Sequence, residues 1–434
     1  MKKIITVLFS AALLYMPSAL FAAGASEAKT ETKEVVIEFW THEDVNRQRL
    51  EDRYIKEFMQ ANPHVTVNVK RFDSEKMADI IKSALDNNTG PTMFNLSIND
   101  EYSHIMNGRI AHVNYKAAGY KDAKALIESY APNMLDPVTI DRHVYGLPLE
   151  LTNWAIFVNK KMFIEAGLDP VNDLPKTWED MMEVSKKIVK REGNTITRRG
   201  YDFRYKYQLE NIVPMVEQLG GHLISIDEKE AIVGKDAWVN VLSFLREWGA
   251  YGQNLGSPEY TAARRLFNKA SGDVAMCSSG LYQVARIKAE NEEFYSSGDW
   301  MVIPYPKFKD AVKDVSACHY GHYYVVNSAA TKQQEESAWA LISYMLSHSE
   351  EYLREVNIIQ PTLALLNSET YKSLPYSEVF IKDMERGHIV YYAENANKIQ
   401  DALKTAVNGV MLEGIAPEAA YEKLKETVQK FISG

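Results

Sequence analysis

The sequence predicts an α/β protein made of two lobes packed side by side. Its 434 residues exceed the roughly 150 residues of an average domain. A strand, a helix and a second strand follow one another between residues 34 and 70, and strands alternate with helices again after residue 140. The two sections are similar in size and no flexible linker separates them, so two lobes are the simplest division.

The amino terminus has the pattern of a secretory signal peptide. Lys2 and Lys3 precede an apolar run over residues 4–14, and small residues follow. We expect cleavage after Ala22, although residues 23–25 offer a second site. Polar residues interrupt the run before about 20 apolar residues accumulate, which argues against a membrane anchor. No cysteine lies near the cut to carry a lipid. The sequence therefore predicts a soluble periplasmic protein with residues 1–22 removed.

The first structural elements form a strand–helix–strand unit. Residues 23–33 are small and polar, so we expect a disordered tether. Residues 34–40 are rich in β-branched and aromatic side chains and predict a strand. The apolar positions between Leu50 and Met59 have helical spacing, and the alternation over 65–69 predicts a second strand. Two strands joined by a helix indicate a parallel pair.

The second section repeats this order. Residues 154–158 predict a buried strand, and Thr177 is the expected N-cap of a helix, with Asp180 three residues on and Gly193 expected to end it. Further amphipathic helices are expected near 236–250 and 332–347. Five tryptophans have core spacing: Trp154, Trp178, Trp238, Trp248 and Trp339.

Composition excludes several classes of protein. The counts of 22 Gly, 15 Pro and 2 Cys fit neither a collagen-like chain nor a disulfide scaffold. A formal charge of −9 argues against nucleic acid as the main partner. Aromatic residues make up 11% of the chain, and their rings can cover polar ligands as well as fill a core. Cys277 and Cys318 could pair after export or remain buried free thiols.

Catalytic and metal-binding motifs are mostly missing. The chain contains no Gly-x-Ser-x-Gly elbow, His-Glu-x-x-His helix, phosphate-binding glycine loop or Cys-x-x-Cys pair. His319 and His322 could present two imidazoles to a metal, but no further ligand has helpful spacing. The sequence therefore predicts no catalytic residues, no metal and no cofactor.

Polar loops follow two of the predicted strands at their carboxyl ends. Residues 41–44 follow the first strand, and residues 97–100 follow a strand over 93–96. Ligands of open α/β sheets bind outside these strand ends. Loops of this kind, facing each other across two lobes, would line a cleft with amides, carboxylates and aromatic rings. That combination suits a sugar or a similar polyhydroxylated solute.

An ordered series of short motifs runs through nearly the whole mature chain. The motifs are Phe39-Trp40-Thr41, Gly90-Pro91, Tyr145-Gly146-Leu147-Pro148, Val158-Asn159-Lys160-Lys161-Met162-Phe163, Pro175-Lys176-Thr177-Trp178, Gly220-Gly221, Gly272-Asp273-Val274-Ala275-Met276 and Pro304-Tyr305-Pro306. Together they resemble the family 1 extracellular solute-binding proteins of ABC importers.

The resemblance implies a type II periplasmic-binding-protein fold, with a ligand cleft between lobes and a hinge of three crossings. The first lobe would comprise residues 34–150 plus 301–346, and the second residues 151–300 plus 347–434. The implied function is capture of a carbohydrate-like solute without catalysis and its delivery to the permease subunits of an ABC transporter. The protein would act as a monomer.

Carried over by position, the resemblance also implies a set of ligand contacts. These are Trp40, Thr41, His42, Glu43, Asp44, Ser97, Asn99 and Asp100 on the first lobe, Glu150, Thr152 and Asn153 at the hinge, and Gln208, Glu210, Asn211, Tyr282, His319, Tyr320, His322 and Asn397 further along. Tyr282 stands where the family often has a stacking tryptophan, and the 319–322 loop replaces a glycine-rich one. We therefore do not expect a simple maltose specificity.

Two other functions fit the same pattern. A secreted carbohydrate-active hydrolase would use a carboxylate pair in the cleft, and turnover of a glycosidic bond would reveal it. A chemoreceptor-associated binding protein would have the same fold and a receptor as its partner.

Overall fold

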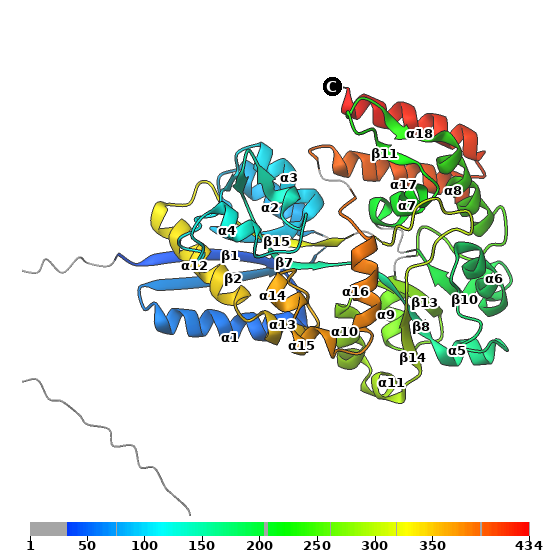
Figure 1. Cartoon of the computed structure of the whole chain (residues 1–434), viewed down its shortest axis with the longest axis horizontal. Helices are drawn as coiled ribbons and strands as arrows, with labels where there is room; N and C mark the ends of the chain where they lie inside the picture. Colours follow the sequence, from blue (N-terminus) through cyan, green and yellow to red (C-terminus); the bar gives the residue numbers. More distant parts are fainter. Residues whose placement is uncertain are drawn as a thin grey trace, which may run out of the picture. The chain divides into compact units, whose positions relative to one another are not determined.

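The computed structural model describes residues 33–74, 76–203, 207–260, 262–317, 319–390 and 393–433 (Figure 1). Residues 34–434 form one compact unit. The predicted signal peptide and all but the last residue of the predicted tether lie outside the described residues. Cys277 is buried in β13 (Val274–Ser279), and Cys318 lies outside the described residues, so the pairing of the two cysteines stays a prediction.

The first lobe is built on a mixed sheet with the strand order β2-β1-β3-β15-β4, and β7 also pairs with β15. Its strands are β1 (Val35–His42), β2 (Val65–Phe72), β3 (Met93–Ser97), β4 (Ile110–Ala111), β7 (Leu147–Thr152) and β15 (Tyr320–Asn327). β1 is parallel to β2 and β3, whereas β15 is antiparallel to β3 and β7. The predicted strand–helix–strand unit is therefore confirmed, with α1 (Val45–Ala61) joining β1 to β2.

Helices and a small hairpin complete this lobe. They are α2 (Met77–Asp86), α3 (Ile98–Met106), α4 (Ala123–Ile127), η1 (Asp136–Val138), β5 (Thr139–Ile140), β6 (His143–Val144), α12 (Lys332–Leu346) and α13 (Ser349–Val356). α1 buries Leu50, Tyr54 and Phe58, which are spaced at one turn, against the core that contains Phe39 and Trp339.

The second lobe is built on a sheet with the order β14-β8-β13-β10-β9. Its strands are β8 (Ala155–Asn159), β9 (Lys190–Glu192), β10 (Thr195–Asp202), β13 (Val274–Ser279) and β14 (Trp300–Ile303), with a separate hairpin of β11 (His222–Ile224) and β12 (Ala231–Val233). Its early helices are α5 (Lys160–Glu165), α6 (Trp178–Ile188), α7 (Gln208–Gln218), α8 (Lys235–Trp248), α9 (Ala263–Asn268), α10 (Tyr282–Glu290) and α11 (Glu292–Ser297).

The remaining helices follow α13 in the chain. They are α14 (Leu363–Leu366), α15 (Glu369–Lys372), α16 (Ser377–Arg386), α17 (Ala396–Leu412) and α18 (Pro417–Ile432). α17 and α18 pack on each other and on α8, which Figure 1 shows as one helical layer.

The chain passes between the two sheets at identifiable points. β7 ends in the first sheet at Thr152, and β8 begins the second at Ala155. β14 belongs to the second sheet and β15 to the first, so another passage follows Ile303. Tyr352 and Val356 of α13 lie in the core of the first sheet, although the predicted limit after residue 346 assigns them to the second lobe. The exact lobe limits stay a prediction.

Two local predictions are confirmed, namely the start of one helix and the burial of the five tryptophans. Thr177 and Asp180 form the expected capping box of α6, and the five predicted core tryptophans are fully buried. The prediction for Gly193 is wrong. α6 ends at Ile188, and Gly193 lies between β9 and β10 with a φ of +60°, where it allows the hairpin to turn.

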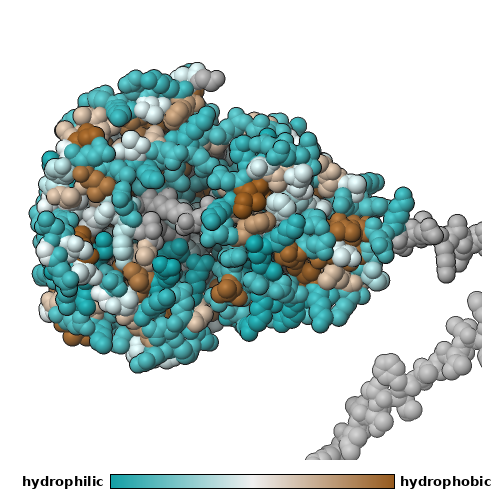
Figure 2. All heavy atoms as spheres, turned by 180° about the vertical axis from the view of Figure 1, so that it is seen from behind, coloured by the Kyte–Doolittle hydropathy of each residue, from teal (hydrophilic) through white to brown (hydrophobic). Residues whose placement is uncertain are grey.

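The surface is mainly polar. Figure 2 shows apolar residues scattered in small groups among hydrophilic ones on one face. In the described ranges, every helix is too short or too polar to cross a lipid bilayer.

Candidate functional site

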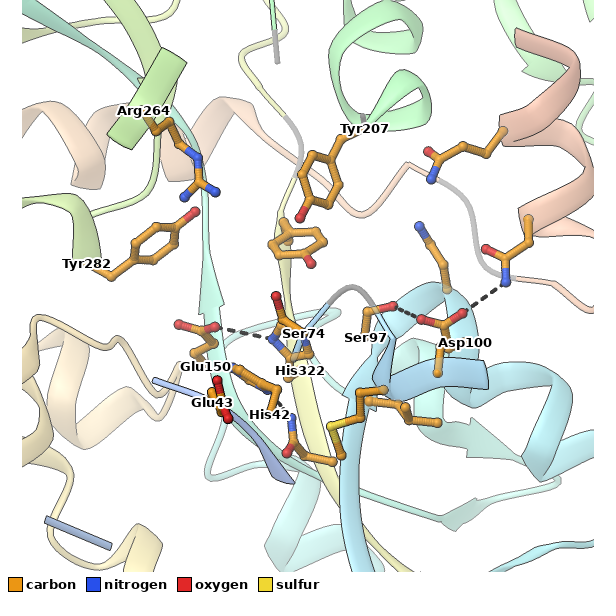
Figure 3. Close-up of a pocket in the computed structure, with 18 of the residues that line it drawn as sticks. His42, Glu43, Ser74, Ser97, Asp100, Glu150, Tyr207, Arg264, Tyr282 and His322 are labelled. Carbon is orange, nitrogen blue, oxygen red and sulfur yellow. Dashed lines mark hydrogen bonds and ion pairs between the residues drawn. The ribbon is translucent and has the colours of Figure 1, made fainter. Parts of the chain in front are cut away.

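A cavity of about 240 Å³ lies where the carboxyl ends of β1 and β3 meet elements of the second lobe (Figure 3). Ten of the predicted contacts line it, namely His42, Glu43, Ser97, Asn99, Asp100, Glu150, Tyr282, Tyr320, His322 and Asn397. The other lining residues are Ser74, Met77, Ala78, Asn95, Leu96, Tyr207, Arg264, Arg286 and Gln400. Most of these side chains carry hydrogen-bonding groups.

His42 is fixed on the floor of the cavity from both sides of its ring. Its Nδ1 lies 2.8 Å from Nδ2 of Asn95, and its Nε2 lies 3.3 Å from Nη1 of Arg47. Arg47 also donates to the carbonyl of His42 and pairs with Glu51 at 2.9 Å. Burial first, and then the charge of Arg47, holds the pKa of His42 well below its ordinary value. The imidazole is therefore neutral at neutral pH.

His322 and Glu150 form a second pair on the floor. They are opposite residues on β15 and β7, and Nδ1 of His322 lies 3.2 Å from Oε1 of Glu150. The rings of His322 and His42 are 4.5 Å apart. Glu150 therefore has a fixed orientation toward the cavity.

His42, Glu150 and His322 bring three potential metal-ligand atoms within 4.8 Å of one another. However, each ring nitrogen of His42 faces a nitrogen donor, and one of these donors is the guanidinium of Arg47. A cation at His42 would have to displace one of these groups and would lie beside a positive charge. The arrangement favours hydrogen bonding to a ligand over metal binding.

Carboxylate and amide groups form one side of the cavity. Ser97 and Asn397 both donate to Asp100, at 2.6 and 2.9 Å, and Asn99 donates to Glu210 at 3.0 Å. Asn99 and Asp100 lie in the first turn of α3, whereas Glu210 and Asn397 lie on α7 and α17. The hydrogen bonds of Asn397 with Asp100 and of Asn99 with Glu210 join the two lobes.

Tyrosine rings and arginines form the other side. Tyr282 begins α10, and the guanidinium of Arg286, one turn on, lies 4.6 Å from its ring centroid. Tyr207 and Tyr320 contact each other edge to face at 5.2 Å. Figure 3 shows the side chains of Arg264, Tyr282 and Tyr207 directed into the cavity.

Asp44 and Arg286 form an ion pair of 2.8 Å at the edge of the cavity. Asp44 also caps α1 by accepting from the backbone of Asn46 and Arg47. Burial would raise the pKa of Asp44, but the charges of Arg286 and Arg47 outweigh it and lower that pKa below its ordinary value. The pair joins α1 of the first lobe to α10 of the second.

The structure does not place all the predicted contacts at the cavity. Within the described residues, nine lie outside its lining, namely Trp40, Thr41, Asp44, Thr152, Asn153, Gln208, Glu210, Asn211 and His319. Trp40 lies two residues before the end of β1, where its ring packs on Phe72 of β2. Thr41, Asp44 and Glu210 hydrogen-bond to residues of the lining.

The others belong to the surrounding structure. Thr152 donates to the carbonyl of the buried Asn153 in the connection from β7 to β8, and Gln208 and Asn211 are buried on α7. His319 lies in a separate cavity, where its Nε2 is 3.1 Å from the carbonyl of Met384.

The strand-end argument missed several lining residues. Asn95 gave a usable signal, since it is a polar residue inside the otherwise apolar stretch 93–96. Arg264 and Arg286 gave none, because arginines on amphipathic helices usually face solvent.

A comparison with models of protein families identifies the family of this chain. Residues 53–360 match the family model of the bacterial extracellular solute-binding proteins. The chain belongs to this family. The resemblance inferred from the sequence is thereby confirmed, and members of this family are binding proteins.

One curated relative is an uncharacterized ABC transporter extracellular-binding protein of Pyrococcus horikoshii. It is 26% identical over 172 residues, which is 38% of this chain and 37% of the relative. The match therefore spans well under half of the relative's length.

Solved structures confirm the two-lobed fold. An ABC transporter solute-binding protein from Thermotoga lettingae, bound with alpha-D-tagatose, is similar with a TM-score of 0.78 at 20% identity, covering 92% of this chain and 100% of that one. The maltose/maltodextrin-binding domain from Bdellovibrio bacteriovorus, bound to maltotriose, gives 0.75 at 18%, with the same coverage. The GacH receptor of Streptomyces glaucescens, solved unliganded and with acarbose, gives 0.78 at 15%, covering 92% and 99%.

Proposed function

We propose that this protein is the exported substrate-binding component of an ABC transporter and that it captures a carbohydrate or similar polyhydroxylated solute. The observation that carries the proposal is a cavity lined by carboxylates, amides and imidazoles together with three tyrosine rings. Planar polar groups bind hydroxyls, while rings cover the C–H faces of a sugar. The tagatose and maltotriose bound to proteins of the same fold support this ligand class.

Closure of the two lobes is the proposed mechanism. A ligand that contacts both walls binds the closed form more tightly and shifts the equilibrium toward it. Asp44–Arg286, Asn99–Glu210 and Asp100–Asn397 support this mechanism, because they are polar contacts between lobes that a closed form requires. A permease would recognise the closed form.

The remaining parts of the proposal follow from this role. A signal peptide over residues 1–22 would deliver the protein to the periplasm, where it acts as a monomer without catalysis. Delivery to permease subunits is favoured over a chemoreceptor role by the similarity to an ABC transporter binding protein.

A thermal-shift screen of the mature protein against mono-, di- and oligosaccharides tests the ligand class. Saturation at about 100 times the Kd is expected to add about 2.7 kcal/mol to the free energy of unfolding. X-ray scattering at saturation then measures closure as a decrease in radius of gyration. Conversion of the saccharide to smaller products would refute the binding role and support the hydrolase.

Replacement of Tyr282 tests the site itself. Tyr282→Ala removes the ring from the cavity and is expected to weaken saccharide binding by about 1–3 kcal/mol. The control is Tyr251→Ala, because Tyr251 is 52% exposed and lies outside the cavity lining. Titration calorimetry measures both affinities. Equal affinities in the two variants would contradict the assignment of Tyr282.

A further inference from the structure

We propose that a second cavity, separate from the proposed saccharide site, binds a small neutral aromatic molecule that carries a hydroxyl group. This cavity has a volume of about 410 Å³, and the described residues that line it do not line the first cavity. Tyr320 and His322 line the first cavity, whereas the preceding residue, His319, lines the second. The two cavities can therefore be occupied independently.

Apolar side chains from separate segments of the chain form most of the walls. They are Ala131 and Met134 between α4 and η1, Leu366 of α14, Ile381 and Met384 of α16, and Ile389. An apolar cavity of about 150 Å³ is large enough for benzene, and apolar walls hold water poorly. Methionine sulfur atoms and the ring of Tyr371 favour an aromatic ligand over an aliphatic one, because both make favourable contacts with aromatic rings.

Hydrogen bonds to the backbone fix two parts of the wall. The hydroxyl of Tyr323 donates to the carbonyl of Met134 at 2.6 Å. The amide of His319 donates to the carbonyl of His388 at 2.8 Å. A Cβ atom built at Gly387 would lie 3.0 Å from Nε2 of His319, so glycine leaves the imidazole room at this position. A cavity with fixed walls needs little ordering when a ligand enters, which favours binding.

His319 gives the cavity a hydrogen-bond acceptor. Its Nε2 lies 3.1 Å from the carbonyl of Met384 and must donate to it, because a carbonyl only accepts. Burial lowers the pKa of His319 to about 4, so the ring is neutral at neutral pH. A neutral imidazole that carries its proton on Nε2 has an acceptor at Nδ1. A ligand that reaches Nδ1 must therefore donate a hydrogen bond, as a hydroxyl can.

The hydroxyl of Tyr371 is a second polar group at this cavity. Tyr371 is 1% exposed, and its hydroxyl has no hydrogen-bond partner among the residues that the structure describes. A buried hydroxyl without a partner is unfavourable. A ligand hydroxyl would supply that partner, because a hydroxyl accepts hydrogen bonds as well as donating them.

The charges at the cavity favour a neutral ligand. Of the described lining residues, Glu385 is exposed to solvent, and Nε2 of His388 pairs with the carboxylate of Glu217 at 3.1 Å. His319 is neutral. An ion that entered would lose its hydration without gaining a buried counter-ion, which is costly.

Carbon-13 NMR of the methionine methyl groups tests the site in the mature protein, with phenol and toluene as probes. Met134 and Met384 line this cavity and Met77 lines the first, so their resonances report on different cavities. Single Met→Leu variants assign the resonances. We expect phenol to shift the methyl resonances of Met134 and Met384 until they saturate, and to leave that of Met77 unchanged.

Two substitutions at the cavity assign the binding. Leu366→Trp fills the cavity and is expected to weaken phenol binding at least about tenfold. Leu363→Trp is the matched control, because Leu363 lies on the same helix, is 41% exposed and does not line the cavity. Tyr371→Phe is expected to weaken phenol binding about fivefold and to leave toluene binding unchanged. Its thermal unfolding temperature should not fall, because the hydroxyl has no partner to lose.

Three results would overturn the proposal. The first is that phenol leaves the Met134 and Met384 resonances unchanged up to its solubility limit. The second is that Leu366→Trp folds and binds phenol as well as Leu363→Trp does. The third is that Tyr371→Phe binds phenol with wild-type affinity, and this result decides the question even if Leu366→Trp does not fold.

Discussion

Arg47 stabilises the floor of the cleft although it does not line it. Its side chain is 1% exposed, and burial of a charge is costly unless partners compensate. Glu51 pairs with it, and it donates to Thr41 Oγ1 and to the carbonyl of His42. Glu51 in turn accepts from the hydroxyl of Tyr324. This buried network fixes the end of β1, and with it the imidazole of His42 that lines the cavity.

His319 makes the stability of the protein sensitive to acid. Burial lowers the pKa of His319 to about 4, from an ordinary value of 6.5. The unfolded chain therefore binds a proton that the folded protein excludes between these values. The stability is fully present above pH 6.5 and falls by about 3 kcal/mol as the pH is lowered toward 4.

Urea unfolding of wild type and His319→Gln at a series of pH values measures this contribution. The variant is expected to lose about 3 kcal/mol less than wild type over this interval. His143→Gln is the control, since His143 is exposed. Parallel pH profiles for wild type and His319→Gln would show that His319 is not the titrating group.

At the scale of single residues, the sequence predicted the position of the cavity better than it predicted the residues that line it. The strand-end rule identified His42, Ser97 and Asp100 because parallel strands bring their carboxyl ends to one edge. It also selected Trp40, which lies two residues before the end of β1, packs on Phe72 and does not line the cavity. Arg264 comes from a short helix of the other lobe, and only the tertiary structure brings it to the cleft.

β15 and β7 carry both the floor of the cleft and the passage between lobes. Two residues separate the end of β7 from the start of β8 in the second sheet, and the last residues of β7 pair with Tyr320, Gly321 and His322. The pairing needs glycine at position 321. A Cβ atom built there would lie 1.8 Å from the carbonyl oxygen of Glu150, which is backbone and cannot rotate away.

Gly321→Ala is therefore expected to push β15 from β7 and to misplace His322 relative to Glu150. Overpacking of this kind costs about 1–3 kcal/mol of stability. The saccharide affinity should fall as well, because both side chains line the cavity. Gly108→Ala is a matched control for thermal unfolding and calorimetry: its Cβ would meet no atom within 4 Å, although its φ of +67° adds local strain. A Gly321→Ala variant with wild-type affinity would contradict this account of the floor.

At the scale of elements, periodicity and capping predicted the helices α1, α6, α8 and α12 and the strands β1, β2, β3 and β8. Thr177 and Asp180 marked the start of α6 because their side chains satisfy the free backbone groups of a first turn. The end of α6 was misplaced because Val189 leaves the helix without a glycine, and the positive φ of Gly193 serves a hairpin instead. Pairing between distant strands, such as β15 with β7, had no local signal.

The two lobes meet through polar contacts as well as through the connecting strands. Asp44, Asn99 and Asp100 come from the first residues or caps of helices on the first lobe, and each contacts a side chain of the second. Such contacts add little to the free energy of folding, but they exist only when the lobes are close. In the proposed mechanism they act on the equilibrium between open and closed forms.

The Asp44–Arg286 pair gives this idea a direct test. Asp44→Asn removes the charge and keeps a side chain that can cap α1. Without the ion pair the closed form loses a contact worth about 1 kcal/mol, so the ligand-free variant should be more open and bind solute about fivefold more weakly. X-ray scattering and titration calorimetry measure the two effects. Because the pKa of Asp44 is lowered, the contribution is present at neutral pH and disappears only below about pH 3.8.

Asp52→Asn is the matched control for this variant. Asp52 pairs with Arg71 at 2.6 Å within the first lobe, so its loss removes an ion pair that does not join the lobes. We expect the radius of gyration and the affinity of this control to match those of the wild type. If Asp44→Asn and Asp52→Asn behave alike in both measurements, the ion pair does not govern closure, and the balance between the two forms must be set by the connecting strands and by the ligand itself.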